Sequence, residues 1–181
     1  MNDLRDYFVT DTLRNGTSVT IRAIRPEDKT KLVSAFRNLE RETIYTRFFQ
    51  YVKELTDQDL KRATEIDFDR EVALVVTANL EDEETIIGTG RYVVFEETDV
   101  GRNAEVAFIV EEDYQGLGIA SRIFRHLVQI GRQNNVSRFK ADVLSGNQAM
   151  LRVFAGSGLP MKQQRDGGVV QVTLSLDETG S

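Results

Sequence analysis

The chain has 181 residues, a formal net charge of −6 and 40% hydrophobic residues. That length and apolar content predict a single domain over residues 1–181 with a full core, and no stretch approaches the ~20 apolar residues of a membrane span. There is no cysteine, which excludes disulfides and thiolate chemistry, and the one histidine excludes a histidine-rich metal site. We therefore expect a cytoplasmic protein with no metal, no membrane contact and, because the acidic chain has no basic cluster, no nucleic-acid partner.

The first quarter of the chain predicts a hairpin followed by a helix. Residues 7–13 and 17–25 flank Asn15-Gly16, a dipeptide typical of tight β-turns, so they should pair as antiparallel strands. Pro26 then begins a helix, because proline suits the first helical turn. The buried face of that helix would carry apolar side chains at helical spacing: Leu32, Phe36 and Leu39.

The middle of the chain predicts a second helix and three strands. Thr56 and Asp59 have the spacing of a capping box and would open a helix that runs to about Ile66. The apolar run at 71–80 is typical of a strand buried on both faces. After an acidic turn, further strands are expected at about 85–96 and 104–110.

The last third predicts two helices that alternate with strands. One helix follows residue 118, since apolar residues recur there at helical spacing and leave His126 among the exposed positions. A strand at 138–144 precedes a second helix. A capping box at Ser145 and Gln148 would open this helix, which runs to about Ala155 and is ended by Gly158. Strands at about 159–164 and 168–176 close the chain. The order ββααβββαβαββ indicates a mixed α/β sheet with helices on both faces.

A glycine-rich turn stands where the strand at 104–110 leads into the following helix. Gly116 and Gly118 would free the backbone to turn its N–H groups outward at the positive end of the helix dipole, which suits a phosphate. A Walker loop is excluded because Ile119-Ala120 stand where Lys-Ser/Thr is needed, and the dinucleotide fingerprint is incomplete because Ser121 takes the place of its third glycine. A helix start that merely needs close packing is the alternative.

Two segments of the chain resemble the cofactor-binding segments of the GNAT (general N-acetyltransferase) superfamily. Gln115, Gly118 and Ala120 match its loop Gln/Arg-x-x-Gly-x-Gly/Ala in order, and residues 147–159 resemble Asn-x-Ala-x-x-x-Leu-Tyr followed by Gly-Phe. The resemblance covers roughly residues 18–176. It implies a mostly antiparallel sheet with one splayed parallel strand pair, and acetyl-CoA as cosubstrate.

A closer similarity is to the bacterial protein-lysine acetyltransferases that modify acyl-CoA synthetases. Four stretches carry it, at residues 21–28, 45–49, 67–71 and 104–108. This similarity implies a protein lysine as the acetyl acceptor. Some of those relatives have a fused cyclic-nucleotide-binding or synthetase-like domain, for which this chain has no room.

The resemblance also implies which residues bind the cosubstrate. Backbone groups of Phe108, Ile109 and Val110 would pair with the pantetheine arm, and one N–H there would polarise the acetyl carbonyl. The pyrophosphate would be wrapped by the loop residues Gln115, Gly116, Leu117, Gly118, Ile119, Ala120 and Ser121. Asn147 would bind pantetheine or simply cap its helix, since asparagine also suits that position.

Acyl transfer to an amine needs a base, because a lysine with a reference pKa of ~10.4 is almost wholly protonated at neutral pH. Glu105 is the candidate, since it matches the glutamate that the lysine acetyltransferases use; an ordinary solvent-facing strand glutamate is the alternative. Glu111 and Glu112 are the next candidates. Four residues stand where the relatives border their acceptor site: Tyr45, Arg47, Phe48 and Phe49. Core packing is the alternative for the two phenylalanines.

One position departs from the superfamily pattern. Phe154 stands where many relatives have a tyrosine that protonates the departing thiolate, and phenylalanine cannot do so. Three functions follow as hypotheses: acetyl transfer to a protein lysine, acetyl transfer to a small amine or polyamine, and a catalytically silent acyl-CoA-binding module. A monomer or a homodimer is expected.

Overall fold

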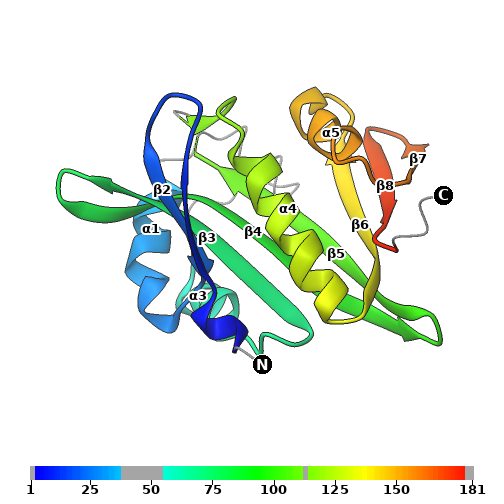
Figure 1. The fold of residues 1–181 in the computed structure, drawn as a ribbon, viewed down its shortest axis with the longest axis horizontal. Helices are drawn as coiled ribbons and strands as arrows, with labels where there is room; N and C mark the ends of the chain where they lie inside the picture. Colours follow the sequence, from blue (N-terminus) through cyan, green and yellow to red (C-terminus); the bar gives the residue numbers. More distant parts are fainter. Residues whose placement is uncertain (1–2, 38–54, 112–113, 178–181) are drawn as a thin grey trace.

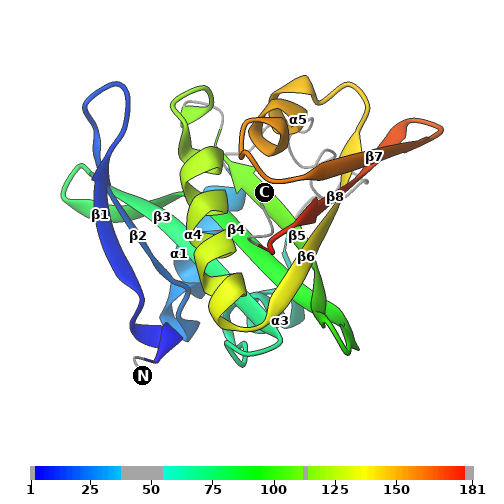
Figure 2. The ribbon, with the colours of Figure 1, turned by 45° about the vertical axis from the view of Figure 1, so that its right-hand side comes forward.

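The computed structural model describes residues 3–37, 55–111 and 114–177. Within them, eight strands form one sheet in the order β1-β2-β3-β4-β5-β6-β8-β7 (Figures 1 and 2). Neighbouring strands are antiparallel except β5 and β6, which are parallel. The expected fold class, a mixed and mostly antiparallel sheet with one parallel pair, is confirmed.

The N-terminal hairpin forms the first edge of the sheet. A 3₁₀ turn at Leu4–Asp6 precedes β1 (Phe8–Thr12), which pairs with β2 (Ser18–Ala23). Pro26–Asp28 is a 3₁₀ turn, and α1 (Lys29–Arg37) begins only after it. The first turn after the proline is therefore 3₁₀ and not α-helical. Its buried Asp28 carboxylate accepts hydrogen bonds from the Arg22 guanidinium and the Arg25 N–H. The predicted core residue Leu39 lies outside the described residues.

The central part of the sheet follows its sequence signals. The Thr56–Asp59 capping box is present in both directions and opens α3 (Asp57–Thr64). Next come β3 (Glu71–Leu80), β4 (Glu83–Thr98) and β5 (Gly101–Val110). β3 is buried from Val72 to Ala78, as its continuous apolar run predicts for a strand that is covered on both faces.

The C-terminal part differs from its prediction at α5. After α4 (Ile119–Gln133) and β6 (Val136–Leu144), α5 (Gln148–Ala155) is capped by Asn147, whose Oδ1 accepts from the Met150 N–H at 3.2 Å. The expected Ser145–Gln148 box is wrong, because the Gln148 amide donates to the Ser145 carbonyl instead. The helix ends at Ala155, as expected, and Gly156 is its C-cap residue. β7 (Met161–Asp166) and β8 (Val169–Ser175) complete the sheet.

Helices cover both faces of the sheet, as expected. Helix α4 crosses one face over β4 and β5, and Figure 1 shows α1 and α3 behind the sheet in the same view. Gly90 of β4 permits the close approach of α4, since a Cβ there would lie 2.3 Å from a side-chain carbon of Ile123. Successive strand residues face opposite ways, so Arg91 points toward α3, where it donates to the Ala63 carbonyl.

The parallel pair β5–β6 is joined over a short distance only. Its register runs from Arg102, opposite Val136, to Glu105, opposite Lys140. Beyond Glu105 the two strands pair only with their outer neighbours, β4 and β8. The sheet is therefore open between β5 and β6 after Glu105 and Lys140. Main-chain groups of the two strands that are not paired with each other line this gap.

Candidate active site

A cleft of about 840 Å³ lies beside the opening between β5 and β6, which we call the β5–β6 cleft. It is bounded by the end of β5, the loop before α4 and the start of α5. A smaller cavity of about 60 Å³ continues it to the point where the strands part, and Phe108, Asn147 and Met150 line both. The larger cleft is lined by most of the residues predicted to bind the cofactor; Ile109 and Leu117 are not among them. Those that line it are Phe108, Val110, Gln115, Gly116, Gly118, Ile119, Ala120, Ser121 and Asn147.

The glycine loop has the conformation that its sequence predicts. Gly116 and Gly118 have φ angles of +81° and +87°, in the left-handed region that favours glycine. Gly118 is the N-cap of α4 and supplies no side chain to bond the first helical N–H groups. The N-terminal amides of this helix are therefore a ready donor set for an anion.

Gln115 has a different position from the one expected for a phosphate-wrapping residue. Its side-chain amide donates to the carbonyl of Val110 at 3.0 Å, so it ties the loop to the end of β5. Leu117, also predicted to wrap the ligand, offers its carbonyl to the Arg122 guanidinium at 3.1 Å. Gln115 still lines the cleft, together with Gly116, Gly118 and the first turn of α4, whereas Leu117 does not.

The three predicted β5 residues divide into two groups. The Arg102 N–H bonds toward β6 and the Glu111 N–H bonds toward β4, and backbone direction alternates along a strand. Even-numbered residues of β5 therefore turn their peptide groups toward β6, and odd-numbered ones toward β4. Phe108 and Val110 face the opening, whereas the peptide groups of Ile109 face β4, where Ile109 pairs with Thr89.

Glu105 lies at the last joined position of β5 and β6, and its exposed side chain lines the small cavity. As an odd-numbered residue it projects on the face of the sheet that carries α1 and α3. Its strand neighbour on β4 is Val93, which is 40% exposed. A carboxylate thus stands where the opening begins and where solvent or an acceptor can reach it. Glu111 lies farther along the same face, and Glu112 lies outside the described residues.

Phe154 closes the apolar end of the small cavity. It is 1% exposed, and its ring packs edge-on against Phe124 with 5.3 Å between centroids and tilted against Phe108 with 6.0 Å. No proton donor stands at this position, as the sequence indicates. Asn147, whose Oδ1 caps α5, also lines this cavity.

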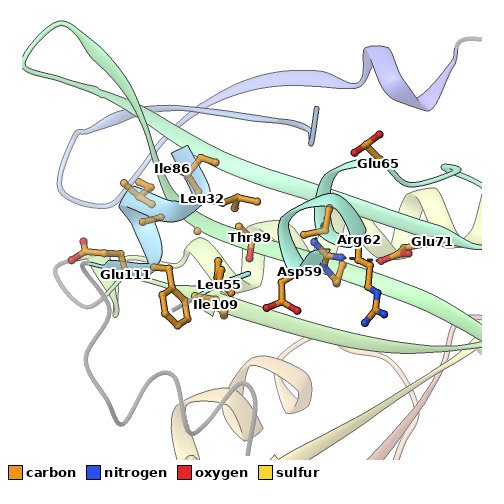
Figure 3. Close-up of a pocket in the computed structure, with 16 residues that line it drawn as sticks. Leu32, Leu55, Asp59, Arg62, Glu65, Glu71, Ile86, Thr89, Ile109 and Glu111 are labelled. Carbon is orange, nitrogen blue, oxygen red and sulfur yellow. Dashed lines mark hydrogen bonds and ion pairs between the residues drawn. The ribbon is translucent and has the colours of Figure 1, made fainter. Parts of the chain in front are cut away.

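A second cavity of about 650 Å³ lies on the other face of the sheet, between α1, α3 and β4; we call it the α1–α3 pocket (Figure 3). Its charged side chains come from separate elements: Asp59, Arg62, Glu65, Glu71, Arg91 and Glu111. Arg91 donates to the Glu71 carboxylate at 2.9 Å, and burial lowers the pKa of Arg91 while this carboxylate opposes the shift. The predicted acceptor-site residues Tyr45, Arg47, Phe48 and Phe49 lie outside the described residues.

His126 is not the surface residue that its helical spacing predicts. It is half-buried, and its Nδ1 is hydrogen-bonded to the Tyr7 hydroxyl from the segment before β1. Burial lowers the pKa of His126 and raises that of Tyr7. The contact joins the first strand to α4, and its partners are 119 residues apart, so no local pattern could have indicated it.

Two further observations concern ligands and membranes. Over residues 3–37, 55–111 and 114–177, no group of three or more acidic, histidine or cysteine side chains is placed to hold a metal ion. In the same ranges, no helix has the length and apolar content needed to cross a bilayer.

The fold and the opened strand pair define an acetyltransferase of the GNAT type, and comparison with known families agrees. Residues 36–158 match the acetyltransferase (GNAT) family, and the chain belongs to this family. The expected enzyme class, N-acetyltransferase, is thereby confirmed, and with it acetyl-CoA as the cosubstrate.

Individual relatives support the same assignment. The solved GNAT domain of S. lividans PAT is 31% identical with a TM-score of 0.83, covering 93% of this chain and 96% of that one. An acetyltransferase of Pseudomonas aeruginosa is 29% identical over 80% of this chain and 76% of its own length. Acetyltransferase Pat of Mycolicibacterium smegmatis is 30% identical over 91% of this chain but 47% of its own length, so the chain spans about half of that relative.

Proposed function

We propose that this chain transfers the acetyl group of acetyl-CoA directly to the side-chain amine of a protein lysine, with Glu105 as general base. The observation that carries the proposal is the parting of β5 and β6 immediately after Glu105. The opening offers unpaired main-chain groups to an extended arm, a donor-rich loop at its outer end and a carboxylate at its inner end.

The cosubstrate would lie along the β5–β6 cleft. The first N–H groups of α4 would bind the pyrophosphate, because they sit at a helix N-terminus with no side-chain cap from Gly118. The pantetheine arm would pair with the main chain of Phe108 and Val110, which faces the opening. Asn147 lines both the cleft and the small cavity, so it would lie beside the pantetheine arm.

The chemical step needs one base and one oxyanion donor. Glu105 takes a proton from the lysine ammonium, directly or through a water, and the neutral amine nitrogen attacks the thioester carbonyl. An N–H of β5 stabilises the oxygen of the tetrahedral intermediate. The C–S bond then breaks as the C–N bond is retained. The nitrogen gives its second proton to water, and the departing thiolate takes a proton from water, because Phe154 has none to give.

A protein acceptor is favoured by the open surface around Glu105. Val93 and Phe95 of β4 are 40% and 48% exposed, and Val93 is the strand neighbour of Glu105. An exposed sheet face of this kind suits a polypeptide segment more than an enclosed small molecule. The stretches that resemble the bacterial protein-lysine acetyltransferases, at residues 21–28, 45–49, 67–71 and 104–108, support this choice of acceptor.

A small cationic amine or polyamine is the second candidate acceptor. The α1–α3 pocket favours it, since its lining includes the carboxylates of Asp59, Glu65, Glu71 and Glu111 against the two arginines Arg62 and Arg91. Its volume of about 650 Å³ is large enough for such a ligand. The cytoplasmic location, the single-domain organisation and a monomeric or dimeric state stay predictions.

The test is to incubate the protein with acetyl-CoA and a cell lysate, and to map acetylated lysines by mass spectrometry. Glu105→Gln serves as the matched inactive control, and spermidine acetylation is measured in parallel. We expect discrete lysine sites that depend on Glu105 and little turnover of spermidine. Efficient spermidine acetylation with no lysine site above the Glu105→Gln background would select the small-amine function instead.

A further inference from the structure

The hairpin of β1 and β2 contacts the glycine loop although it precedes the region that matches the family. The family match begins at residue 36, whereas the hairpin occupies residues 8–23. Two arginines make the connection: Arg14 in the hairpin turn and Arg122 in the first turn of α4. Neither belongs to the loop pattern at residues 115–120.

Arg122 joins β1 to the loop through one guanidinium group. Its Nε donates to the Asp11 carboxylate at 2.8 Å and its Nη2 to the Thr12 carbonyl at 3.1 Å. Its Nη1 donates to the loop carbonyls of Leu117 and Gly118 at 3.1 and 3.2 Å. The Thr12 N–H and the Arg122 guanidinium also hold the pKa of the Asp11 carboxyl below its usual range.

These bonds fix the direction of the N–H groups in the loop. In a trans peptide the C=O and N–H point opposite ways, so a carbonyl held toward Arg122 turns the N–H of the next residue away from it. The two carbonyls belong to the peptides whose N–H groups are those of Gly118 and Ile119, both of which line the β5–β6 cleft. Arg122 therefore fixes the orientation of these two N–H groups, so that they can donate to a ligand in that cleft.

Arg14 reaches the same loop from outside and lines the cleft itself. Its Nη1 lies 3.4 Å from the Gly116 carbonyl, and its Nε lies 3.6 Å from where a Cβ on Gly118 would be. A long bond to one carbonyl leaves most of the five guanidinium N–H donors available, and such a fork matches phosphate geometry. The side chain is exposed at the mouth of the cleft.

We infer that the β1–β2 hairpin forms part of the cosubstrate phosphate site. Arg14 is a phosphate-binding residue, and Arg122 is a positioning residue that joins Asp11 to the loop. The inference rests on the proposed position of acetyl-CoA in the β5–β6 cleft. The hairpin adds a positively charged side chain to a loop whose main-chain donors have no formal charge, in a protein of net charge −6.

The test compares acetyl-CoA with S-acetylpantetheine, which lacks every phosphate, as cosubstrates. Arg14→Ala is expected to raise the Kd of CoA roughly 3- to 30-fold in calorimetry, as for the loss of a charge-assisted hydrogen bond at a partly exposed site. The ratio of kcat/KM for acetyl-CoA to that for S-acetylpantetheine should fall by the same factor. Arg122→Met should move both quantities in the same direction, and Asp11→Asn should do so to a smaller extent.

Arg165→Ala is the matched control, since it removes an exposed arginine on β7 away from the cleft. The inference is overturned if Arg14→Ala and Arg122→Met bind CoA as the wild type does, or if their loss is equal for both cosubstrates. If Gly118→Asp abolishes CoA binding while Arg14→Ala leaves it intact, the hairpin inference alone fails. A wild type that does not bind CoA, or a Gly118→Asp variant that still does, overturns the cleft assignment as well.

Discussion

The β5–β6 cleft and the α1–α3 pocket are cavities of similar size on opposite faces of one sheet, but different chemical groups line them. The cleft is lined mainly by residues from two segments of the chain, 114–121 and 144–153, which include glycines and the N-terminal amides of α4. The pocket is lined by side chains from α1, α3, β3, β4 and β5, among them the Arg91–Glu71 ion pair.

This difference separates two parts of the reaction. In the proposed function, main-chain donors would recognise phosphate and the pantetheine amides, which are the same in every acetyl-CoA molecule. Side-chain charges decide which amine can approach, and they can change without disturbing the cleft. Glu105 stands between the two regions, at the inner end of the cleft and on the face of the pocket. Substitutions should therefore affect cosubstrate binding, acceptor use or stability separately.

Glu105→Gln tests the junction of the two regions and has the largest expected effect. Loss of a general base costs roughly 10²–10⁴-fold in turnover, while the affinity for CoA should stay near that of the wild type because the side chain lies beyond the phosphate loop. Steady-state kinetics and calorimetry measure the two quantities. Glu111→Gln is the matched variant, and a larger loss of turnover there than in Glu105→Gln would make Glu111 the base.

Gly118→Asp tests the cleft alone. A Cβ at this position would lie 2.5 Å from the Arg122 Nη1, and its φ of +87° is unfavourable for any other residue. Acetyl-CoA at a hundred times its Kd should stabilise the wild type by about 2.7 kcal/mol, and this variant should lose that gain. Thermal unfolding with and without acetyl-CoA is the measurement. Gly158→Asp, at another positive φ after α5 and outside the cleft lining, should keep the gain.

Glu71→Gln tests the pocket alone. It leaves the Arg91 guanidinium without its carboxylate in a site where burial already lowers the pKa of that arginine. Because the two side chains are 19% and 27% exposed, we expect a loss of about 1–3 kcal/mol in unfolding free energy rather than the full cost of a buried pair. Urea denaturation measures it. The stabilisation by acetyl-CoA should persist; its disappearance would mean that the cavities are not independent.

Phe154→Tyr asks whether the cleft lacks a useful acid. The new hydroxyl would enter an apolar contact among Phe108, Phe124 and the small cavity, so we expect turnover to hold or to fall by less than about tenfold. A rise above about tenfold, or ~1.4 kcal/mol at the barrier, would show that thiolate departure limits the reaction and would favour a decayed enzyme. Thiol release under saturating acetyl-CoA provides the rate.

The smallest effect is expected from His126, the one histidine of the chain. Burial lowers its pKa, Arg125 adds to this effect and Asp11 opposes it, so the folded state binds the proton less tightly than the unfolded state. As the pH falls through about 6.5 the unfolded state is protonated first, and the free energy of unfolding should decrease. Melting curves between pH 7.5 and 5.5 should show a shallower slope for His126→Gln. An equal slope would place the titrating group elsewhere.

Much of the fold could be predicted because its signals are local. Three signals each involve residues that are close together in the sequence, and each element forms where its signal predicts. They are the apolar run of β3, the buried stripe Ile119, Ile123 and Leu127 on α4, and the Thr56–Asp59 capping box. The glycine loop is also local, since a positive φ at Gly116 and Gly118 depends on the residue itself. At α5 two caps competed, and Asn147 prevails over Ser145 because its side chain reaches the Met150 N–H.

What could not be predicted depends on pairs of residues that are distant in the sequence. The Arg122–Asp11 bond joins residues 111 positions apart, and the buried Arg22 and the half-exposed Glu84 that bonds it are 62 apart. The charges of the α1–α3 pocket likewise come from separate elements and form no motif. The division of β5 into residues that face the opening and residues that face β4 needs the strand pairing, which one strand's sequence does not contain.

The central claim is that acetyl-CoA occupies the β5–β6 cleft rather than the α1–α3 pocket, and hydrogen–deuterium exchange with and without acetyl-CoA tests it most directly. The account predicts slower exchange at residues 106–110 and 115–121, with little change in α1 and α3. The same experiment with Gly118→Asp should show no slowing. Slower exchange confined to residues 29–37 and 57–64, with the glycine loop unaffected, would contradict it.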